Sequence, residues 1–245
     1  MIVKTHCEGS SEIGVFSKLT NKYCLVGIAD SQNFYSTFES ELPPEIPVFN
    51  ALINNTKIIG RMCIGNSKGL LLPHITTDNE LKHITNSMPD GVRVKRINER
   101  YTALGNMILN NDYVALVHHE ISKETEEDIC DVLGVEVFRH TIGSNVLAGS
   151  YGVLSNKGGL LHSAIKLDER KELSELLGLP LLSGTLNSGC DLIGAGLVVN
   201  DWVGFCGLKT TATEMAVIES IFNLDDHNNV EISESLRDPM IEKLL

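Results

Sequence analysis

The chain has 245 residues, of which 42% are hydrophobic and 21% are charged, and its formal net charge is −12 at pH 7. This length and apolar content suffice to bury a core, whereas the acidic charge disfavours binding to free DNA. No run approaches about 18 apolar residues and residues 1–10 lack the layout of a secretory signal, so we expect a location on the cytosolic or nuclear side of membranes.

A strand-like segment, Ile2–His6, opens the chain, and a repeated motif follows it. The motif is a small apolar residue, Gly, a gap of five or six residues, and Asn, and its asparagines are Asn21, Asn66, Asn111, Asn156 and Asn200. The intervals between them are 45, 45, 45 and 44 residues. A period held over the whole chain indicates one supersecondary unit copied five times.

Each copy has the same predicted elements, in the same order. A short apolar strand reaches the Gly, at Ile13-Gly14, Ile59-Gly60, Leu104-Gly105, Ala148-Gly149 and Ile193-Gly194. The Asn closes a hairpin, because Asn tolerates positive φ, and a second strand follows at Tyr23–Val26, Leu70–Leu72, Tyr113–Val117, Leu160–Leu161 and Trp202–Phe205. Helices are predicted at Ser36–Leu42, Asp78–Ser87, Lys123–Leu133, Asp168–Leu177 and Thr213–Phe222. Third strands are predicted at Ile46–Ile53, Val92–Ile97, Val135–Ile142 and Leu179–Leu186.

The fifth copy lacks a third strand, and Ile2–His6 is the candidate to replace it. That pairing would close the chain into a ring and remove exposed sheet edges. We therefore expect an α/β ring of five repeats over residues 1–224. Residues 225–245 carry six acids against two bases and are predicted to form an acidic tail outside the ring.

Charge is uneven along the chain. Residues 56–100 carry a net charge of +4 and the remainder −16, and the predicted strand Val92–Ile97 is more basic than an exposed strand usually is. This pattern suits a partner that combines a basic protein with nearby RNA. Ordinary solvated side chains explain it equally well.

The sequence offers little catalytic chemistry. Three Gly-containing stretches lack the complete nucleotide-binding fingerprints, so we expect no nucleotide cofactor. The six cysteines have neither Cys-x-x-Cys nor metal-ligand spacing, so we expect reduced thiols and no metal. In His118-His119-Glu120, neighbours on an extended chain should point to opposite faces and chelate poorly, so we expect a strand end there and not a metal site. The best nucleophile candidate is Cys206, with His140 or His162 as its base.

Six blocks of the sequence are long enough to be specific: Glu12–Asn21, Asn33–Leu42, Asn111–Val117, Asp131–Phe138, Gly194–Asp201 and Val217–Phe222. They resemble the translation initiation factor 6 family of ribosome anti-association factors, and the similarity extends from residue 1 to about residue 224. The resemblance implies a pentein fold, with five quasi-equivalent units around a pseudo-fivefold axis. It also implies binding to the intersubunit face of the large ribosomal subunit, which blocks joining of the small subunit.

The resemblance further implies partners and locations. The expected partners are a ribosomal protein beside the sarcin-ricin loop, possible ribosomal RNA nearby, and a release GTPase with its cofactor protein. A monomeric factor would take part in maturation and nuclear export of the large subunit, in nucleolus, nucleus and cytoplasm. The alternative is a guanidine-modifying enzyme with a Cys nucleophile, because other penteins are arginine deiminases and amidinotransferases.

A binding face can be proposed from the period. Phe16, Arg61, Asn106, Tyr151 and Ala195 each lie five residues before a motif Asn, which predicts equivalent positions at one end of the ring. The family resemblance implies that Arg61, Asn106 and Tyr151 contact the ribosomal protein, and Phe16 is predicted to join them. The family's paired phosphorylation serines are replaced here by Ser174 and Glu175, so Ser174 is a candidate phosphorylation site.

Overall fold

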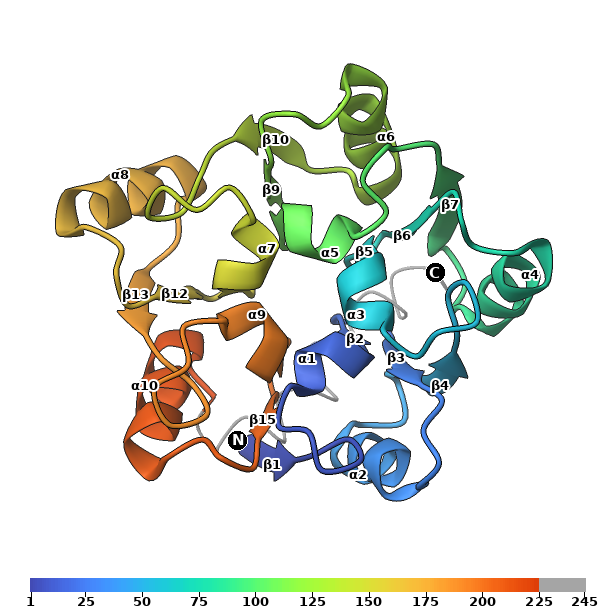
Figure 1. The fold of residues 1–245 in the computed structure, drawn as a ribbon, viewed down its shortest axis with the longest axis horizontal. Helices are drawn as coiled ribbons and strands as arrows, with labels where there is room; N and C mark the ends of the chain where they lie inside the picture. Colours follow the sequence, from blue (N-terminus) through green and yellow to red (C-terminus); the bar gives the residue numbers. More distant parts are fainter. Residues whose placement is uncertain (225–245) are drawn as a thin grey trace, which may run out of the picture.

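The structure is a computed structural model that describes residues 1–224, so the predicted acidic tail lies outside the described residues. Five units surround a central axis, with short helices nearest the axis and longer helices at the periphery (Figure 1). No helix among residues 1–224 is long and apolar enough to cross a membrane.

Every unit contains one three-stranded sheet. The first strands are β2 (Ser17–Leu19), β5 (Ile64–Gly65), β8 (Ile108–Asn110), β11 (Gly152–Leu154) and β14 (Leu197–Val199). They run antiparallel to the central strands β3 (Cys24–Gly27), β6 (Gly69–Pro73), β9 (Val114–Val117), β12 (Gly159–His162) and β15 (Gly204–Gly207). Four outer strands pair in parallel with the central ones: β4 (Val48–Ala51), β7 (Arg93–Ile97), β10 (Glu136–Arg139) and β13 (Leu181–Gly184).

The fifth sheet is completed by the beginning of the chain. Strand β1 (Ile2–Thr5) pairs in parallel with β15, so that Ile2 lies opposite Gly204 and Thr5 opposite Gly207. The N-terminal amine also donates a hydrogen bond to the carbonyl of Leu224. The predicted closure of the ring by the N-terminal segment is therefore confirmed.

The peripheral helices are α2 (Asn33–Glu41), α4 (Asp78–Ser87), α6 (Lys123–Leu133), α8 (Leu167–Leu177) and α10 (Ala212–Phe222). Thr77 and Thr211 form capping boxes with Glu80 and Glu214, and these reciprocal bonds satisfy amide groups that a helix start leaves unpaired. The sequence prediction placed all five helices correctly to within a few residues.

The residues predicted as the first strand of each copy are instead one-turn helices. These are α1 (Ile13–Phe16), α3 (Ile59–Met62), α5 (Leu104–Met107), α7 (Ala148–Tyr151) and α9 (Ile193–Gly196). Their glycines pack against one another in a closed circle: a Cβ on Gly60 would lie 2.2 Å from the Gly14 carbonyl oxygen, and one on Gly105 2.3 Å from that of Gly60. A four-residue apolar run does not distinguish strand from helix, which explains the wrong assignment.

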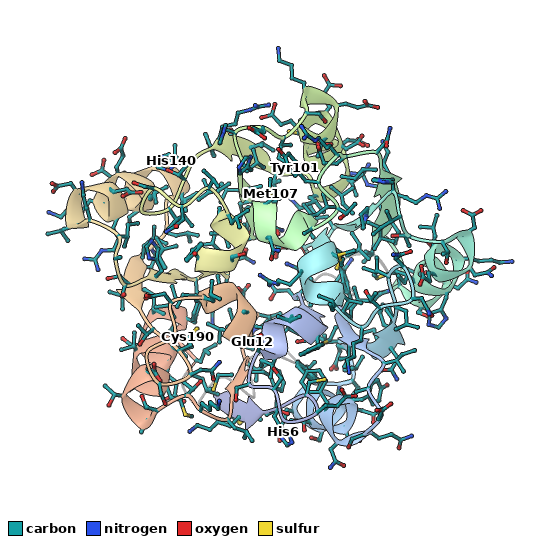
Figure 2. All side chains as sticks on the ribbon, in the orientation of Figure 1. His6, Glu12, Tyr101, Met107, His140 and Cys190 are labelled. Carbon is teal, nitrogen blue, oxygen red and sulfur yellow. The ribbon has the colours of Figure 1, made fainter. Side chains whose placement is uncertain are left out.

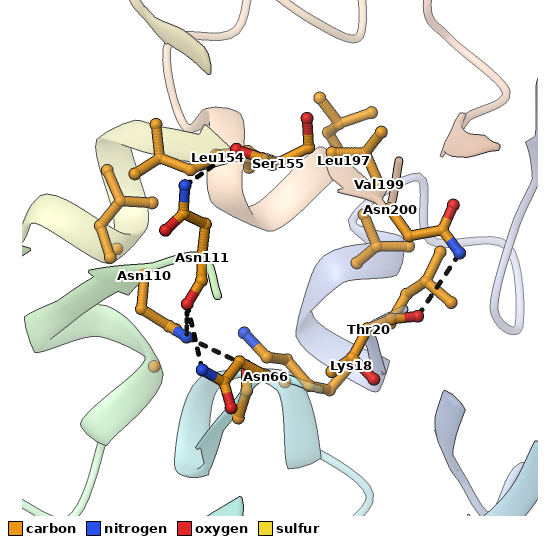
Figure 3. Close-up of a pocket in the computed structure, with 18 of the residues that line it drawn as sticks. Lys18, Thr20, Asn66, Asn110, Asn111, Leu154, Ser155, Leu197, Val199 and Asn200 are labelled. Carbon is orange, nitrogen blue, oxygen red and sulfur yellow. Dashed lines mark hydrogen bonds between the residues drawn. The ribbon is translucent and has the colours of Figure 1, made fainter. Parts of the chain in front are cut away.

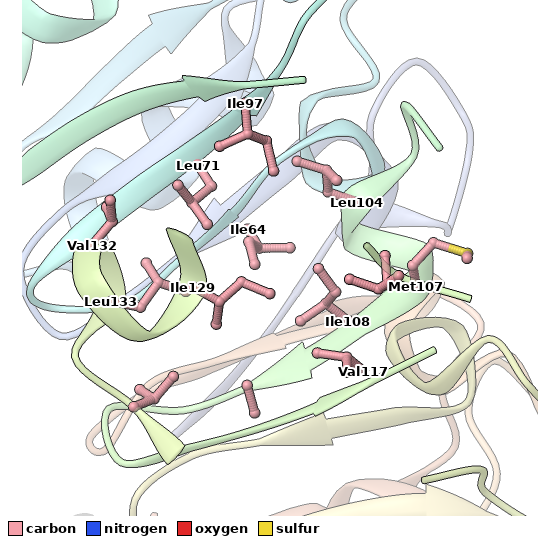
Figure 4. Close-up of a cluster of buried hydrophobic side chains, with 13 residues drawn as sticks. Ile64, Leu71, Ile97, Leu104, Met107, Ile108, Val117, Ile129, Val132 and Leu133 are labelled. Atoms are coloured by element: carbon pink, nitrogen blue, oxygen red, sulfur yellow. The ribbon is translucent and has the colours of Figure 1, made fainter. Parts of the chain in front are cut away.

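The hydrophobic core is divided into five clusters, each at a junction between neighbouring units. In the cluster of Figure 4, Ile64 and Leu71 of the second unit pack with Ile108, Val117 and Ile129 of the third. All five side chains are 3% exposed or less. No unit can bury its apolar face alone, so the five units form one structural body.

The basic strand β7 has partners inside the protein. Arg93 lies 3.3 Å from Asp131 and Lys95 lies 2.5 Å from Asp128, both acids belonging to α6 of the next unit. These two bases therefore connect neighbouring units, which gives the basic strand a structural role. Each pair is partly solvent-exposed, so its contribution to stability is small.

Candidate binding face and central channel

The hairpin turns form one end of the central channel. The backbone amides of Thr20, Asn66, Asn111, Ser155 and Asn200 each donate to the carbonyl three residues later, so these five residues are structurally equivalent. Repeats one and four contain one additional residue before their Asn. The sequence prediction, which aligned Asn21 and Asn156 with the other three asparagines, is wrong by one position in those repeats.

Side chains join the five turns to each other. Asn66 Nδ2 donates to the Asn111 carbonyl at 3.3 Å, Asn111 Nδ2 to that of Ser155 at 3.1 Å, and Asn200 Nδ2 to that of Thr20 at 3.4 Å (Figure 3). Thr20 and Ser155 have no amide to continue this series. The series therefore has two gaps, one in repeat one and one in repeat four.

Two asparagines and two aspartates cover these gaps. Asn21 Nδ2 lies 3.0 Å from Asp112 Oδ2 and 2.6 Å from Asp201 Oδ2, and Asn156 Nδ2 contacts the same two oxygens at 2.7 and 2.8 Å. Both carboxylates also accept backbone amide bonds, Asp112 from Ser67 and Asp201 from Asn156. The hairpin end of the channel thus carries two acids whose bonds are satisfied by the protein.

The opposite end is formed by the short helices, and three of the four predicted binding residues meet at α7. Arg61 Nη1 donates to the Gly149 carbonyl at 2.9 Å, Asn106 Oδ1 accepts from Ser150 Oγ at 3.2 Å, and Tyr151 belongs to α7 itself. The rings of Tyr151 and His162 form a T-shaped pair with 5.3 Å between their centroids. Phe16 lies apart from them on α1, with Lys57 Nζ 5.7 Å from its ring centroid.

The predicted equivalence of these positions is also wrong by one residue. We call the glycines of the closed circle, one in each short helix, the ring glycines, and the residues that follow them are Val15, Arg61, Asn106, Ser150 and Ala195. Phe16 and Tyr151 come one position later. In repeats one and four the Asn itself stands one residue later than in the other repeats, so counting back five residues from it also ends one residue too late. The predicted role of Phe16, Arg61, Asn106 and Tyr151 in binding does not depend on this equivalence and stays a prediction.

Between the two ends is a channel of about 90 Å³ that sequence reasoning missed. Lys18 of β2 and Arg61 of α3 both line it, and Figure 3 shows the Lys18 side chain extending into its interior. Burial lowers the pKa of Lys18 to about 8, while Cys63 and Asp112 oppose this fall and Arg61 adds to it. Burial also lowers the pKa of Arg61, to about 10.

The residues proposed for catalysis are not assembled. Cys206 is fully buried, and burial raises the pKa of its thiol, whereas a nucleophilic Cys needs a lowered one. His162 bonds with the Ile142 carbonyl, and His140 with the Thr141 carbonyl at the outer part of the molecule (Figure 2). Neither histidine bonds to Cys206 among the described residues.

The His118-His119-Glu120 segment follows the end of strand β9 at Val117, so the predicted strand end is confirmed. The predicted orientation is wrong, because the rings of His118 and His119 stack at 4.3 Å instead of pointing to opposite faces. Within residues 1–224, no group of three or more His, Cys, Asp and Glu side chains is placed to hold a metal ion.

Ser174 lies in the last turns of α8 and is half-buried. Its hydroxyl donates to the Leu179 carbonyl at 2.5 Å, beyond the end of the helix. A kinase would have to break this bond before it could modify the hydroxyl.

Five α/β units around one axis, closed by the N-terminal strand, define the pentein class of folds. The model of the eIF-6 family matches residues 2–221. The chain is 57% identical over 242 residues to eukaryotic translation initiation factor 6 of Saccharomyces cerevisiae, and 55% identical to factor 6-2 of Arabidopsis thaliana, each match covering 99% of both chains. The Schizosaccharomyces pombe factor is 57% identical, again over 99% of both chains. The protein belongs to the eIF-6 family of translation initiation factors.

Solved structures that resemble the chain include two enzymes. A dimethylarginine dimethylaminohydrolase is 12% identical with a TM-score of 0.47 and covers 70% of this chain and 68% of its own. The N-terminal domain of ArgZ, an arginine dihydrolase from cyanobacteria, is 11% identical with a TM-score of 0.46 and covers 71% and 68%.

Proposed function

We propose that this protein binds the intersubunit face of the large ribosomal subunit and prevents the small subunit from joining. Membership of the eIF-6 family supports a role in translation initiation. The mechanism we propose is occupancy: a closed ring on that face excludes the bridging contacts of the other subunit, so no bond is made or broken. The fully buried Cys206 thiol, with its raised pKa, argues against the deiminase-type alternative.

The observation that carries the proposed binding face is the meeting of Arg61, Asn106 and Tyr151 at α7. Tyr151 is the anchor in this proposal, because Tyr buries a large area while keeping a polar hydroxyl, and interfaces are enriched in it. Arg61 and Asn106 hold α7 in place through its backbone and Ser150. Phe16, on α1, would extend the contact around the same end of the ring.

Sucrose-gradient co-sedimentation with purified ribosomal subunits tests this proposal. We expect the protein to travel with the large subunit only and to reduce the fraction of joined ribosomes. Tyr151→Ala should weaken this binding by about 10-fold or more, as expected of an interface anchor. Tyr113→Ala is the matched control, because Tyr113 is 65% exposed and follows the hairpin turn at the opposite end of the channel.

The outcomes separate the alternatives. Equal binding of the Tyr151→Ala and wild-type proteins would remove the proposed face, and binding to neither subunit would remove the proposed function. Conversion of arginine to citrulline that depends on Cys206 would favour the enzyme instead.

We propose in addition that the protein accompanies the large subunit through late maturation and nuclear export. It would then be found in nucleolus, nucleus and cytoplasm, and a GTPase with its cofactor protein would release it. The expected ribosomal contact is a protein beside the sarcin-ricin loop, with RNA nearby. Imaging of the tagged protein while export of the large subunit is blocked tests this route, since accumulation in the nucleus is expected and an unchanged distribution would contradict it.

A further inference from the structure

The central channel contains more positive charge than the protein around it neutralises. Lys18 Nζ donates no hydrogen bond to any residue in the range 1–224, and Arg61 Nε is buried without an acceptor there. Buried charges in proteins are normally paired, because removing them from water carries a large cost. Arg61 keeps one bond, from Nη1 to the Gly149 carbonyl, whereas Lys18 is partly buried and extends into the channel with no acceptor among residues 1–224.

The acidic and thiol groups that face these cations do not fill this role. Asp112 lies at the hairpin end, where Ser67, Asn21 and Asn156 already donate to its oxygens. Burial raises the pKa of the Cys63 thiol to about 11, although Lys18 and Arg61 lower it, so the thiol is neutral at pH 7.

A third unpartnered group identifies the kind of ligand. Asn110 Oδ1 is buried and has no donor within residues 1–224, while the amide nitrogen of the same side chain donates to the Gly65 carbonyl at 3.1 Å. Asn110, Lys18 and Arg61 all line the channel, so it offers two kinds of unused donor and one unused acceptor. The channel holds about six waters if each needs about 15 Å³, which leaves room for a small ligand.

We propose that the channel binds a protonated oxyanion, of which inorganic phosphate is the probe. Its unprotonated oxygens accept from Lys18 Nζ and Arg61 Nε, and its hydroxyl donates to Asn110 Oδ1. A sulfate dianion has no hydroxyl at neutral pH and leaves Asn110 without a donor. The site shares Arg61 with the proposed ribosome contact, so the test below changes Lys18, which that contact does not include.

Calorimetric titration and thermal unfolding of the full chain, purified without phosphate or sulfate, test the proposal. We expect phosphate to bind with a Kd of about 1 mM or tighter, so that 10 mM phosphate raises Tm by about 3 to 6 °C at constant ionic strength. Sulfate should bind at least about 10-fold more weakly, since it leaves a buried acceptor unpaired. Lys18→Met should abolish the shift, whereas Lys171→Met, at an exposed lysine of α8, should keep it.

Phosphorus NMR of phosphate in the presence of protein gives a second readout that does not depend on unfolding. We expect the line to broaden with wild type and with Lys171→Met and not with Lys18→Met. Absence of both broadening and a Tm shift in the wild type, or equal effects in all three proteins, would overturn the site. Equal affinity for sulfate and phosphate would overturn the role of Asn110 and the preference for a protonated anion.

Discussion

Gly105→Ala tests the circle of glycines that joins the short helices. The added Cβ would lie 2.3 Å from the Gly60 carbonyl oxygen and 3.0 Å from that of Cys63. The first distance is more than about 1 Å inside normal van der Waals contact. Both opposing atoms belong to the backbone, and a closed ring cannot widen one junction without moving the others.

The expected cost is at the upper end of the range for overpacking, about 3 kcal/mol. For a protein of this size such a change lowers Tm by about 6 to 12 °C, which differential scanning calorimetry measures directly. Because Asn106 follows Gly105 and bonds to Ser150 of α7, binding to the large subunit should weaken as well.

Gly184→Ala is the control for this prediction. Its Cβ would meet only side-chain atoms, the nearest being a methyl of Leu160 at 3.3 Å, which can move. We expect a Tm within about 2 °C of wild type for the control. If Gly105→Ala unfolds at the same temperature as Gly184→Ala, the glycine circle is not a rigid junction and the reasoning is refuted.

Three further predictions concern pH, ring closure and modification. Burial alone would raise the pKa of Glu214, but bonds from the Thr211 backbone and other donors lower it from 4.5 to about 2. This carboxylate therefore stabilises the fold above pH 4.5 and loses that effect as the pH falls toward 2. Glu214→Gln should remove this pH-dependent contribution of about 1–2 kcal/mol to the free energy of unfolding, which thermal unfolding from pH 5 to pH 2 measures. A variant with the same pH profile as wild type would contradict this. Deletion of residues 1–5 should expose the edge of β15 and cause aggregation on size-exclusion chromatography, and a monodisperse peak would argue against the closure. Ser174→Glu should lower stability by about 1–2 kcal/mol in urea unfolding, because it loses the bond to Leu179 and adds negative charge near the end of α8; Ser174→Ala, which loses only the bond, should cost less.

The peripheral helices and the ring closure were predictable because their signals are local. Helix α4 begins after Thr77 with Glu80 three residues on, and the missing third strand of the fifth copy leaves Ile2–His6 as its replacement. The one-turn helices were not predictable, because their conformation follows from contacts between glycines of neighbouring units that lie far apart in the sequence. Sequence alone does not supply those neighbours.

The site was predicted in part. Arg61, Asn106 and Tyr151 do come together, but through α7 and not through equivalent positions. Lys18 was missed because it looks like an ordinary outward-facing strand residue between Ser17 and Leu19. Nothing in the local sequence indicates that it will face a closed channel. Its environment is set by five strands from five units, which no local pattern encodes.

The five residues after the ring glycines occupy the same place in each unit, yet their side chains differ in chemistry. Val15 is aliphatic, Arg61 carries a cation, Asn106 an amide, Ser150 a hydroxyl and Ala195 only a methyl group. A ring of five identical units could bind a surface equally well in five orientations, each rotated by a fifth of a turn. Restricting it to one of them would cost about RT ln 5, or about 1 kcal/mol, of binding free energy. Different chemistry at one repeated backbone position makes the rotations unequal. The backbone symmetry therefore provides the closed shape, and the side chains give the disc a single angular orientation on any surface that it binds.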